Sequence, residues 1–445
     1  MRVFTPYTPA ARLVDFLLNC GVILVATTIY SSSPWLLNLL LALPAAFIFL
    51  TTRPPAQKTL SRPPNKNKTT EYSPSLLPVK PFVTHYRGSM MMITCVAILA
   101  VDFRVFPRRF GKVENWGTSL MDMGVGSFVF TSGVVSARSS LKANTEARPS
   151  LYKRLVVSIR HSIPLLVLGY IRLLSVRSVD YAVHVSEYGV HWNFFFTLGF
   201  LPPFSALCQT AFDLIPSYAV LACLIGTAYE IVLDKTALTK FMLTAPRTDL
   251  LSKNREGIFS FIGYLAIFLA GQSLGSYTLP RQRAFRKDAS IVEVIRQSIL
   301  GKLVFSAIAW TALFYMSTNY YGLGLSVSRQ LANFPYILWV SAFNTANIAL
   351  CCAIETLCFP NLYKNATKEE EVRKSREATS TILFAFNRNG LTVFLVANLL
   401  TGLVNITLPT LHMGTAESMA ILVGYIAVVT GVALGLDRLD LSIKL

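Results

Sequence analysis

The sequence predicts an all-α, polytopic integral membrane protein folded as a helical bundle. Hydrophobic residues make up 53% of the chain and charged residues only 14%, whereas soluble domains carry about a quarter charged residues. Apolar runs of about twenty residues, the length that spans a bilayer, recur from one end to the other. The alternating ten-residue strands of a membrane barrel are not apparent. The net charge of +18 is therefore interpreted as loop charge that sets topology and contacts lipid, not nucleic acid.

Hydropathy predicts about twelve spans in a single transmembrane domain covering residues 1–445. A polar, proline-rich loop at about 52–85 follows the second span and is expected to be mobile. The segment ILFAFNRN, just before the eleventh span, predicts a short amphipathic helix. The predicted spans are about 12–31, 34–51, 87–105, 118–137, 156–177, 190–212, 214–233, 258–279, 298–318, 334–357, 390–407 and 416–436.

The distribution of Lys and Arg among the loops predicts the orientation. The loops on one face are rich in these residues, so we expect that face and both termini of this chain to be cytoplasmic. The other face is then luminal, and it has two basic exceptions at about 104–117 and 234–257. A basic loop on that side either binds phosphate or another anionic group, or is a tolerated exception to a statistical rule. The rich loops are about 52–87, 138–154, 280–297 and 361–388, and the poor ones about 178–189, 319–333 and 408–415.

The central stretch of the sequence is Leu99–Phe130, where a basic segment connects two predicted spans. Asp102 lies near the end of the first apolar run. An ionisable residue at membrane depth is costly, so it is a functional candidate that needs a partner. The nearest candidate is Lys112, across a turn that Pro107 favours. Alternatively, Asp102 only caps its helix and the basic residues face lipid headgroups.

Other polar residues near the predicted luminal ends of spans are candidates for substrate binding. They cluster in the central stretch, in HVSEYGVHWNFFF, in the NREG segment and in SVSRQLANFPYILWV. Backbone N–H groups at the start of a helix, together with an arginine, provide a site for an anion. The candidates are Arg108, Arg109, Asp122, His184, Glu187, His191, Trp192, Asn193, Asn254, Arg255, Arg329 and Asn333.

Several of these candidates have a structural alternative. The histidine segment also fits an interfacial aromatic belt, and Arg255 and Glu256 also fit a plain ion pair. Asn398 and Asn405 lie on one helix face, where hydrogen bonds between helices are the favoured interpretation. No metal-ligand spacing, phosphate-binding loop, dinucleotide fingerprint or GxSxG motif is present, so we expect neither a metal nor a bound cofactor.

Several stretches taken together resemble the inositol acyltransferases of glycosylphosphatidylinositol (GPI)-anchor biosynthesis. This is the family of the fungal GPI-anchored wall transfer proteins and their animal counterpart, PIG-W. The resemblance covers nearly the whole chain in the same order. The stretches that carry it are RVFPRRFGKVENWGTSLMDMGVGSFVF, HVSEYGVHWNFFFTLG, NREGIFSFIGY, SVSRQLANFPYILWV, NGLTVFLVANLLTGLVN and the C-terminal IKL.

The resemblance implies a multi-pass enzyme of the endoplasmic reticulum membrane. It would transfer a fatty acyl chain, usually palmitoyl, from acyl-CoA to the inositol 2-hydroxyl of glucosaminyl-phosphatidylinositol. Acyl-CoA is then a co-substrate, and the glycolipid and membrane lipid are the other partners. The paired catalytic Asp and Lys of the family fall on Asp102 and Lys112, with the site towards the lumen. Family members usually have thirteen spans, and this chain begins at what resembles their second span, which agrees with two cytoplasmic ends.

Two other functional classes remain open on the sequence. A lipid or solute transporter is also polytopic with buried charges, but many transporters show paired internal repeats and broken helices, which are not apparent here. If the protein were a non-catalytic scaffold, Asp102 and Lys112 would have no evident function.

Overall fold

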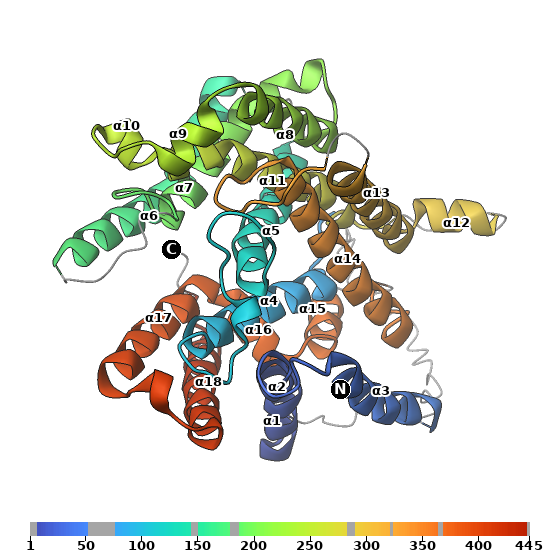
Figure 1. Ribbon diagram of the computed structural model, residues 1–445. Helices are drawn as coiled ribbons and strands as arrows, with labels where there is room; N and C mark the ends of the chain where they lie inside the picture. Colours follow the sequence, from blue (N-terminus) through green and yellow to red (C-terminus); the bar gives the residue numbers. More distant parts are fainter. Residues whose placement is uncertain are drawn as a thin grey trace. The chain divides into compact units, whose positions relative to one another are not determined.

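The regular structure of the chain is helical throughout the part that is described (Figure 1). This confirms the all-α prediction. Residues 52–75, which form most of the predicted mobile loop, and His184 fall outside the described residues. The computed structural model describes residues 7–51, 76–143, 150–178, 187–282, 290–320, 324–363 and 368–442.

The described residues form the following helical elements. In order they are α1 (Pro9–Phe16), η2 (Leu17–Gly21), α2 (Val22–Thr27), α3 (Pro34–Thr51), α4 (Pro81–Ala100), η3 (Arg108–Phe110), α5 (Leu120–Ala143), α6 (Leu151–Ser178), α7 (Phe194–Cys208), η4 (Gln209–Asp213), α8 (Tyr218–Lys235), α9 (Leu238–Thr244), α10 (Leu250–Lys253), α11 (Arg255–Thr278), α12 (Ile291–Gln297), α13 (Ile299–Asn319), α14 (Phe334–Cys358), α15 (Lys368–Glu377), α16 (Thr381–Arg388), α17 (Gly390–Thr407), η5 (Thr410–His412) and α18 (Thr415–Arg438).

Ten helical segments in the described part are long and apolar enough to cross a membrane, so the chain is a multi-pass membrane protein. They coincide with ten of the twelve predicted spans. The other two predictions fall on α3 and α8. The apolar part of α3, Pro34–Ile48, is shorter than a span. Helix α8 carries three charged residues, Glu230, Asp234 and Lys235, within its eighteen positions, more than the apolar window of a span allows.

The third predicted span, about 87–105, needs a correction because α4 begins and ends earlier. Pro81 occupies the first position of α4, where its missing N–H costs nothing. After Ala100 the chain tightens, since the N–H groups of Asp102 and Phe103 donate to carbonyls three residues back. Asp102 therefore lies in a turn after the helix, not within it.

The chain divides into two compact units. Unit 1 comprises Met1–Ser75, Met91–Arg109 and Phe359–Ile443. Unit 2 comprises Leu76–Met90, Phe110–Cys358 and Lys444–Leu445. The chain passes from one unit to the other within α4. The expectation of a single transmembrane domain stays a prediction.

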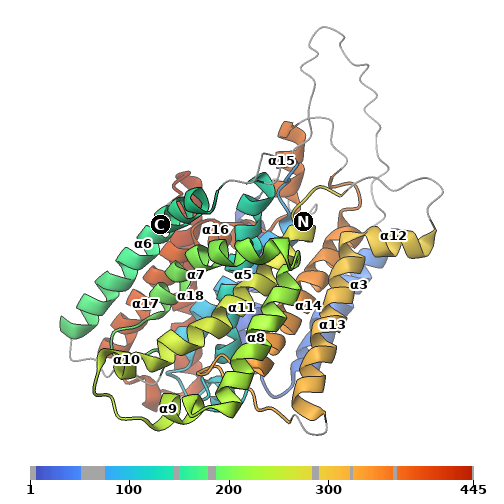
Figure 2. The same cartoon turned by 90° about the horizontal axis from the view of Figure 1, so that it is seen from above.

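Unit 2 is built around α11, most of which is buried. Helices α5, α7, α8, α13 and α14 all pack against it, and Figure 2 shows α5 and α8 along its sides. Small residues allow the closest approach. A Cβ on Gly133 of α5 would collide with the carbonyl of Phe268, and one on Gly271 of α11 would collide with the carbonyl of Phe130. Packing through small residues drives helix association in lipid, where hydrophobic burial between helices gives little.

Unit 1 contains the predicted amphipathic segment, which forms α16. This helix packs against α1, α17 and α18. Buried Asp15 of α1 joins the start of α16, because its carboxylate accepts hydrogen bonds from the Ser380 hydroxyl at 2.8 Å and the Ile382 N–H at 3.3 Å. Tyr7 donates to the same carboxylate at 2.8 Å. Polar contacts between these helices therefore supplement apolar packing.

Candidate functional site

Asp102, the first predicted catalytic residue, belongs to unit 1 and bonds to α17. The side-chain amide of Asn405 donates to Oδ2 of Asp102 at 2.9 Å. Asn398, on the same face of α17, instead donates to the carbonyl of Phe394 in its own helix at 2.7 Å. Asn405 thus makes the contact between elements that the sequence suggested for the asparagine pair, and the carboxylate that it orients is that of Asp102.

Arg108 and Arg109, also in unit 1, follow Asp102 in the short helix η3. The guanidinium of Arg108 donates to the carbonyl of Val101 at 3.2 Å, next to Asp102. Arg109 donates to the carbonyl of Ser31 at 2.7 Å. Both arginines are exposed, which is compatible with contacts to an anionic group. Their role in substrate binding stays a prediction.

Lys112, the second predicted catalytic residue, belongs to unit 2. Its Nζ lies 2.7 Å from Oε1 of Glu187. The lysine side chain is 39% exposed and that of Glu187 is 24% exposed, so the pair remains accessible to a substrate. The direct pairing of Lys112 with Asp102 stays a prediction, and Glu187 is the partner that Lys112 has within its own unit.

Asp122 is fully buried at the start of α5 and organises the backbone beside Lys112. Its Oδ1 accepts from Nε of Arg329 at 2.7 Å. Its Oδ2 accepts from the Ser119 hydroxyl at 2.7 Å and from the N–H of Val113 at 3.1 Å. Val113 directly follows Lys112 in the chain. The buried ion pair therefore fixes the position from which Lys112 extends.

Arg329 remains charged in a buried environment. Burial opposes its charge, but nearby tyrosine phenols and the carboxylates of Glu187 and Asp122 raise the pKa of Arg329 above its usual value. Tyrosines also bond to the backbone of the pair: Tyr264 donates to the Arg329 carbonyl at 3.4 Å, and Tyr336 donates to the Asp122 carbonyl at 2.8 Å. The charge of Arg329 is thus neutralised locally by Asp122.

Asn254 joins the histidine segment to the NREG segment. Its Oδ1 accepts from the N–H groups of His191 at 2.8 Å and Trp192 at 2.9 Å. Trp192 donates its indole N–H to the hydroxyl of Thr197 at 2.9 Å. Asn193 caps α7, since its Oδ1 accepts from two N–H groups of the first turn. These candidates are engaged in structural hydrogen bonds, which favours the structural alternative for them.

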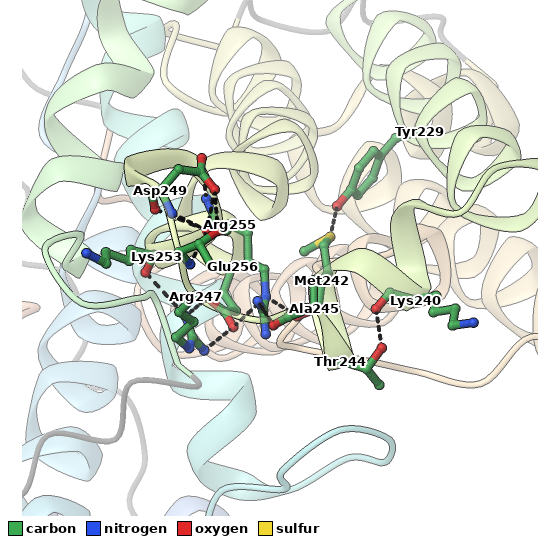
Figure 3. A network of polar contacts seen from close by, with 12 residues as sticks. Tyr229, Lys240, Met242, Thr244, Ala245, Arg247, Asp249, Lys253, Arg255 and Glu256 are labelled. Carbon is green, nitrogen blue, oxygen red and sulfur yellow. Dashed lines mark hydrogen bonds and ion pairs between the residues drawn. The ribbon is translucent and has the colours of Figure 1, made fainter.

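Arg255 lies at the start of α11 in the network of Figure 3, and its side chain is 5% exposed. Nε donates to the carbonyl of Met242 at 2.8 Å, and Nη1 donates to the carbonyl of Ala245. Buried Glu256 pairs with Arg247, whose Nη1 donates to Oε2 at 3.0 Å. Nε of Arg255 also lies 3.4 Å from Oε1 of Glu256, the ion pair of its structural alternative, and its backbone bonds anchor the end of α9 to α11.

Comparison with known proteins identifies the family. A family model described as GWT1 matches residues 1–436. The chain belongs to the GWT1 family. It is 54% identical over 457 residues to GPI-anchored wall transfer protein 1 of Aspergillus fumigatus, an alignment covering 100% of this chain and 91% of that protein. It is 44% identical to the protein of the same name from Yarrowia lipolytica (99% and 90% covered) and 40% identical to that from Candida albicans (98% and 90% covered).

The family assignment confirms the resemblance found in the sequence and leaves the site residues to be tested. In this GWT1-family chain, unit 2 joins seven of the candidates in two clusters. One contains Lys112 with Glu187, whose charge also acts on Arg329, and Asp122, which pairs with Arg329. The other contains Asn254 with His191 and Trp192. The sequence did not identify Ser119 and Tyr336 as partners of Asp122. Ser119 stands three residues before Asp122, which is the spacing of a helix N-cap. This spacing could have indicated the contact from the sequence.

Proposed function

We propose that this GWT1-family chain is an O-acyltransferase of GPI-anchor biosynthesis. It transfers a fatty acyl chain, such as palmitoyl, from acyl-CoA to the inositol 2-hydroxyl of glucosaminyl-phosphatidylinositol. The observation that carries the proposal is the match across almost the whole chain to proteins named GPI-anchored wall transfer protein 1. Together with the motifs on Asp102 and Lys112, this match supports a transferase acting in the endoplasmic reticulum membrane.

The reaction exchanges one acyl bond for another. The oxygen of the inositol hydroxyl bonds to the thioester carbonyl carbon, and its proton passes to Asp102. The carbon–sulfur bond then breaks, and CoA leaves as a thiolate that takes up the proton. The products are an inositol ester and free CoA. The acyl donor supplies the leaving group, so the residues need only move the proton and stabilise the oxyanion.

Asp102 is suited to be the general base in this proposal. Its place in a turn after α4 puts a carboxylate at the end of an apolar helix. Asn405 holds that carboxylate by donating to Oδ2 at 2.9 Å. An oriented base transfers a proton more efficiently than a freely rotating one. The apolar surfaces of the spans provide the environment that the acyl chain requires.

Lys112 supplies positive charge to the developing oxyanion in this proposal. Glu187 holds its ammonium at 2.7 Å, and the bond from the N–H of Val113 to Asp122 holds the backbone beside it. Both the ammonium group of Lys112 and the backbone next to it are thereby held in place. The exposed guanidinium groups of Arg108 and Arg109 are proposed to contact phosphates of CoA or of the phosphoinositide.

The test uses purified full-length protein with labelled palmitoyl-CoA and glucosaminyl-phosphatidylinositol. The Asp102→Asn variant keeps the size of the side chain and removes the base, and Lys112→Met keeps most of the apolar stem and removes the charge. If both groups act in one catalytic unit, each variant loses most acyl transfer and the double variant loses little more. Absence of acylated inositol with wild-type protein, or an active double variant, would overturn the proposal.

A further inference from the structure

A cavity of about 610 Å³ lies in unit 2 beside the segment that carries Lys112. Trp116 of that segment contributes one wall. Glu230 and Asp234, near the end of α8, contribute a second wall. Lys240 of α9 and the loop that precedes α14 line the remainder of this open cavity. Its size lies within the usual range for small-molecule sites, about 300–1,000 Å³.

The lining combines apolar side chains, among them Leu233, Leu325 and Leu331, with charges of both signs. Trp116 is 45% exposed and offers a flat aromatic face. Carboxylates stand on α8, an ammonium stands on Lys240, and hydroxyl groups come from the connection between α8 and α9 and from the loop before α14. A fatty acyl chain offers no partner for the charged groups, whereas an amino sugar phosphate presents an apolar ring face, a rim of hydroxyls, an ammonium and an anionic group. The cavity, with apolar and charged groups side by side, therefore suits a hydroxyl-bearing molecule that carries both an ammonium and an anionic group.

The wall formed by the loop before α14 is held rigidly. Asn333 donates to the carbonyl of Ser326 at 2.9 Å and accepts from the N–H of Ser328 at 3.0 Å. Glu230 accepts from the N–H of Phe334 at 2.8 Å, which joins this wall to α8. Ala332 has a φ of +47°, a left-handed conformation that persists only where the surroundings enforce it. A preformed wall lowers the entropy cost of binding.

The same loop is bonded to the segment of Lys112. The N–H of Gly117 donates to the carbonyl of Val327 at 2.8 Å. The hydroxyl of Ser328 donates to the carbonyl of Asn115 at 2.6 Å. A molecule bound in the cavity is consequently held at a fixed position relative to the segment from which Lys112 extends.

We infer that this cavity binds the amino-sugar phosphate headgroup of the glycolipid acceptor. The inference rests on the proposed function and adds where the acceptor is recognised. Carboxylates of Glu230 and Asp234 pair with the glucosamine ammonium, Lys240 pairs with the phosphodiester, and Trp116 packs on the sugar ring. Asp234 lies 2.8 Å from Lys235, but this pair is exposed, so the exchange of partners costs little.

The experiment measures binding of a soluble headgroup, glucosaminyl-inositol phosphate, to purified full-length protein by calorimetry. It also measures the KM of both substrates in the acyl-transfer assay. Trp116→Ala and Asp234→Asn each are expected to weaken headgroup binding about tenfold, equivalent to about 1.4 kcal/mol. The KM for the glycolipid rises in parallel, while the KM for acyl-CoA does not change. Matched controls are Tyr152→Ala and Glu377→Gln, exposed residues that do not line the cavity, which leave both values unchanged.

The outcomes separate this inference from the proposed function. Active protein whose headgroup binding is unaffected by both cavity variants overturns the cavity assignment and leaves acyl transfer standing. Suppose that the wild-type protein is inactive but binds the headgroup, and that the Trp116→Ala variant does not bind it. This result supports the cavity assignment and overturns the proposed transferase activity. A wild-type protein that does not bind the headgroup overturns the cavity. Equal affinity for an N-acetylated headgroup overturns the pairing of ammonium with carboxylates.

Discussion

Arg329 and Asp122 form a buried ion pair between residues 207 positions apart, with Nε of the arginine 2.7 Å from Oδ1 of the aspartate. Their side chains are 5% and 0% exposed. The pair connects the loop before α14 to the start of α5, and the second oxygen of Asp122 holds the backbone beside Lys112. It therefore combines a structural task with the positioning of a proposed catalytic residue.

Removing one member of this pair is expected to destabilise the protein strongly. Asp122→Asn leaves the charge of Arg329 buried without its partner, and such a change costs about 3–5 kcal/mol. Combining this substitution with Arg329→Met removes the unpaired buried charge, so the double variant recovers part of the lost stability. Thermal unfolding of purified protein measures both effects. Glu370→Gln, which breaks the partly exposed pair with Lys374, serves as the control and is expected to cost at most about 1 kcal/mol. Unchanged stability in Asp122→Asn would contradict the prediction.

Glu187 is expected to act through Lys112. Glu187→Gln removes the charged partner of the ammonium without changing the size of the side chain, so kcat falls by roughly tenfold. The KM of either substrate is expected to stay unchanged, because other residues make the proposed contacts with the glycolipid and acyl-CoA. Glu187→Asp retains the charge and restores part of the rate. Steady-state kinetics with each substrate varied makes the measurement, and a raised KM at normal kcat would instead place Glu187 in direct contact with a substrate.

Arg255→Lys distinguishes the two interpretations of the NREG segment. Lysine keeps the charge but cannot reproduce the donors that Arg255 directs at two backbone carbonyls. The structure therefore predicts a loss of about 1–3 kcal/mol in stability, because a buried acceptor is left unpaired. Kinetic constants of the folded fraction are expected to stay near those of the wild type. A raised KM with unchanged thermal stability would favour anion binding by Arg255.

The loop charges predict the orientation of the chain. Accessibility tags at the C-terminus and in the loop at about 52–85 are both expected to report the cytosol. A tag in the connection between α8 and α9, which borders the cavity, is expected to report the lumen. Protease protection or tag labelling in sealed microsomes makes the comparison. A luminal report from either of the first two tags would reverse the orientation.

Local sequence determined the helices and the family. Hydropathy depends on consecutive residues, so ten spans and the amphipathic helix α16 followed from it. The end of α4 did not follow from hydropathy, since the apolar run continues through Val101 and Phe103. The backbone hydrogen bonds there change to carbonyls three residues back, which ends the helix. The motifs around Asp102 and Lys112 carried the resemblance because they are continuous stretches.

Only the tertiary structure decided which polar groups meet. Asn405 lies 303 positions from Asp102, and nothing in either segment specifies the other. Arg255 and Arg329 look alike in the sequence, each an arginine before a span, but one bonds to backbone carbonyls and the other to a buried carboxylate. A hydrogen bond depends on the distance between two atoms, and packing of distant helices sets that distance. The sequence by itself determined the type of each residue and the helix that carries it, and the packing of those helices determined its partner.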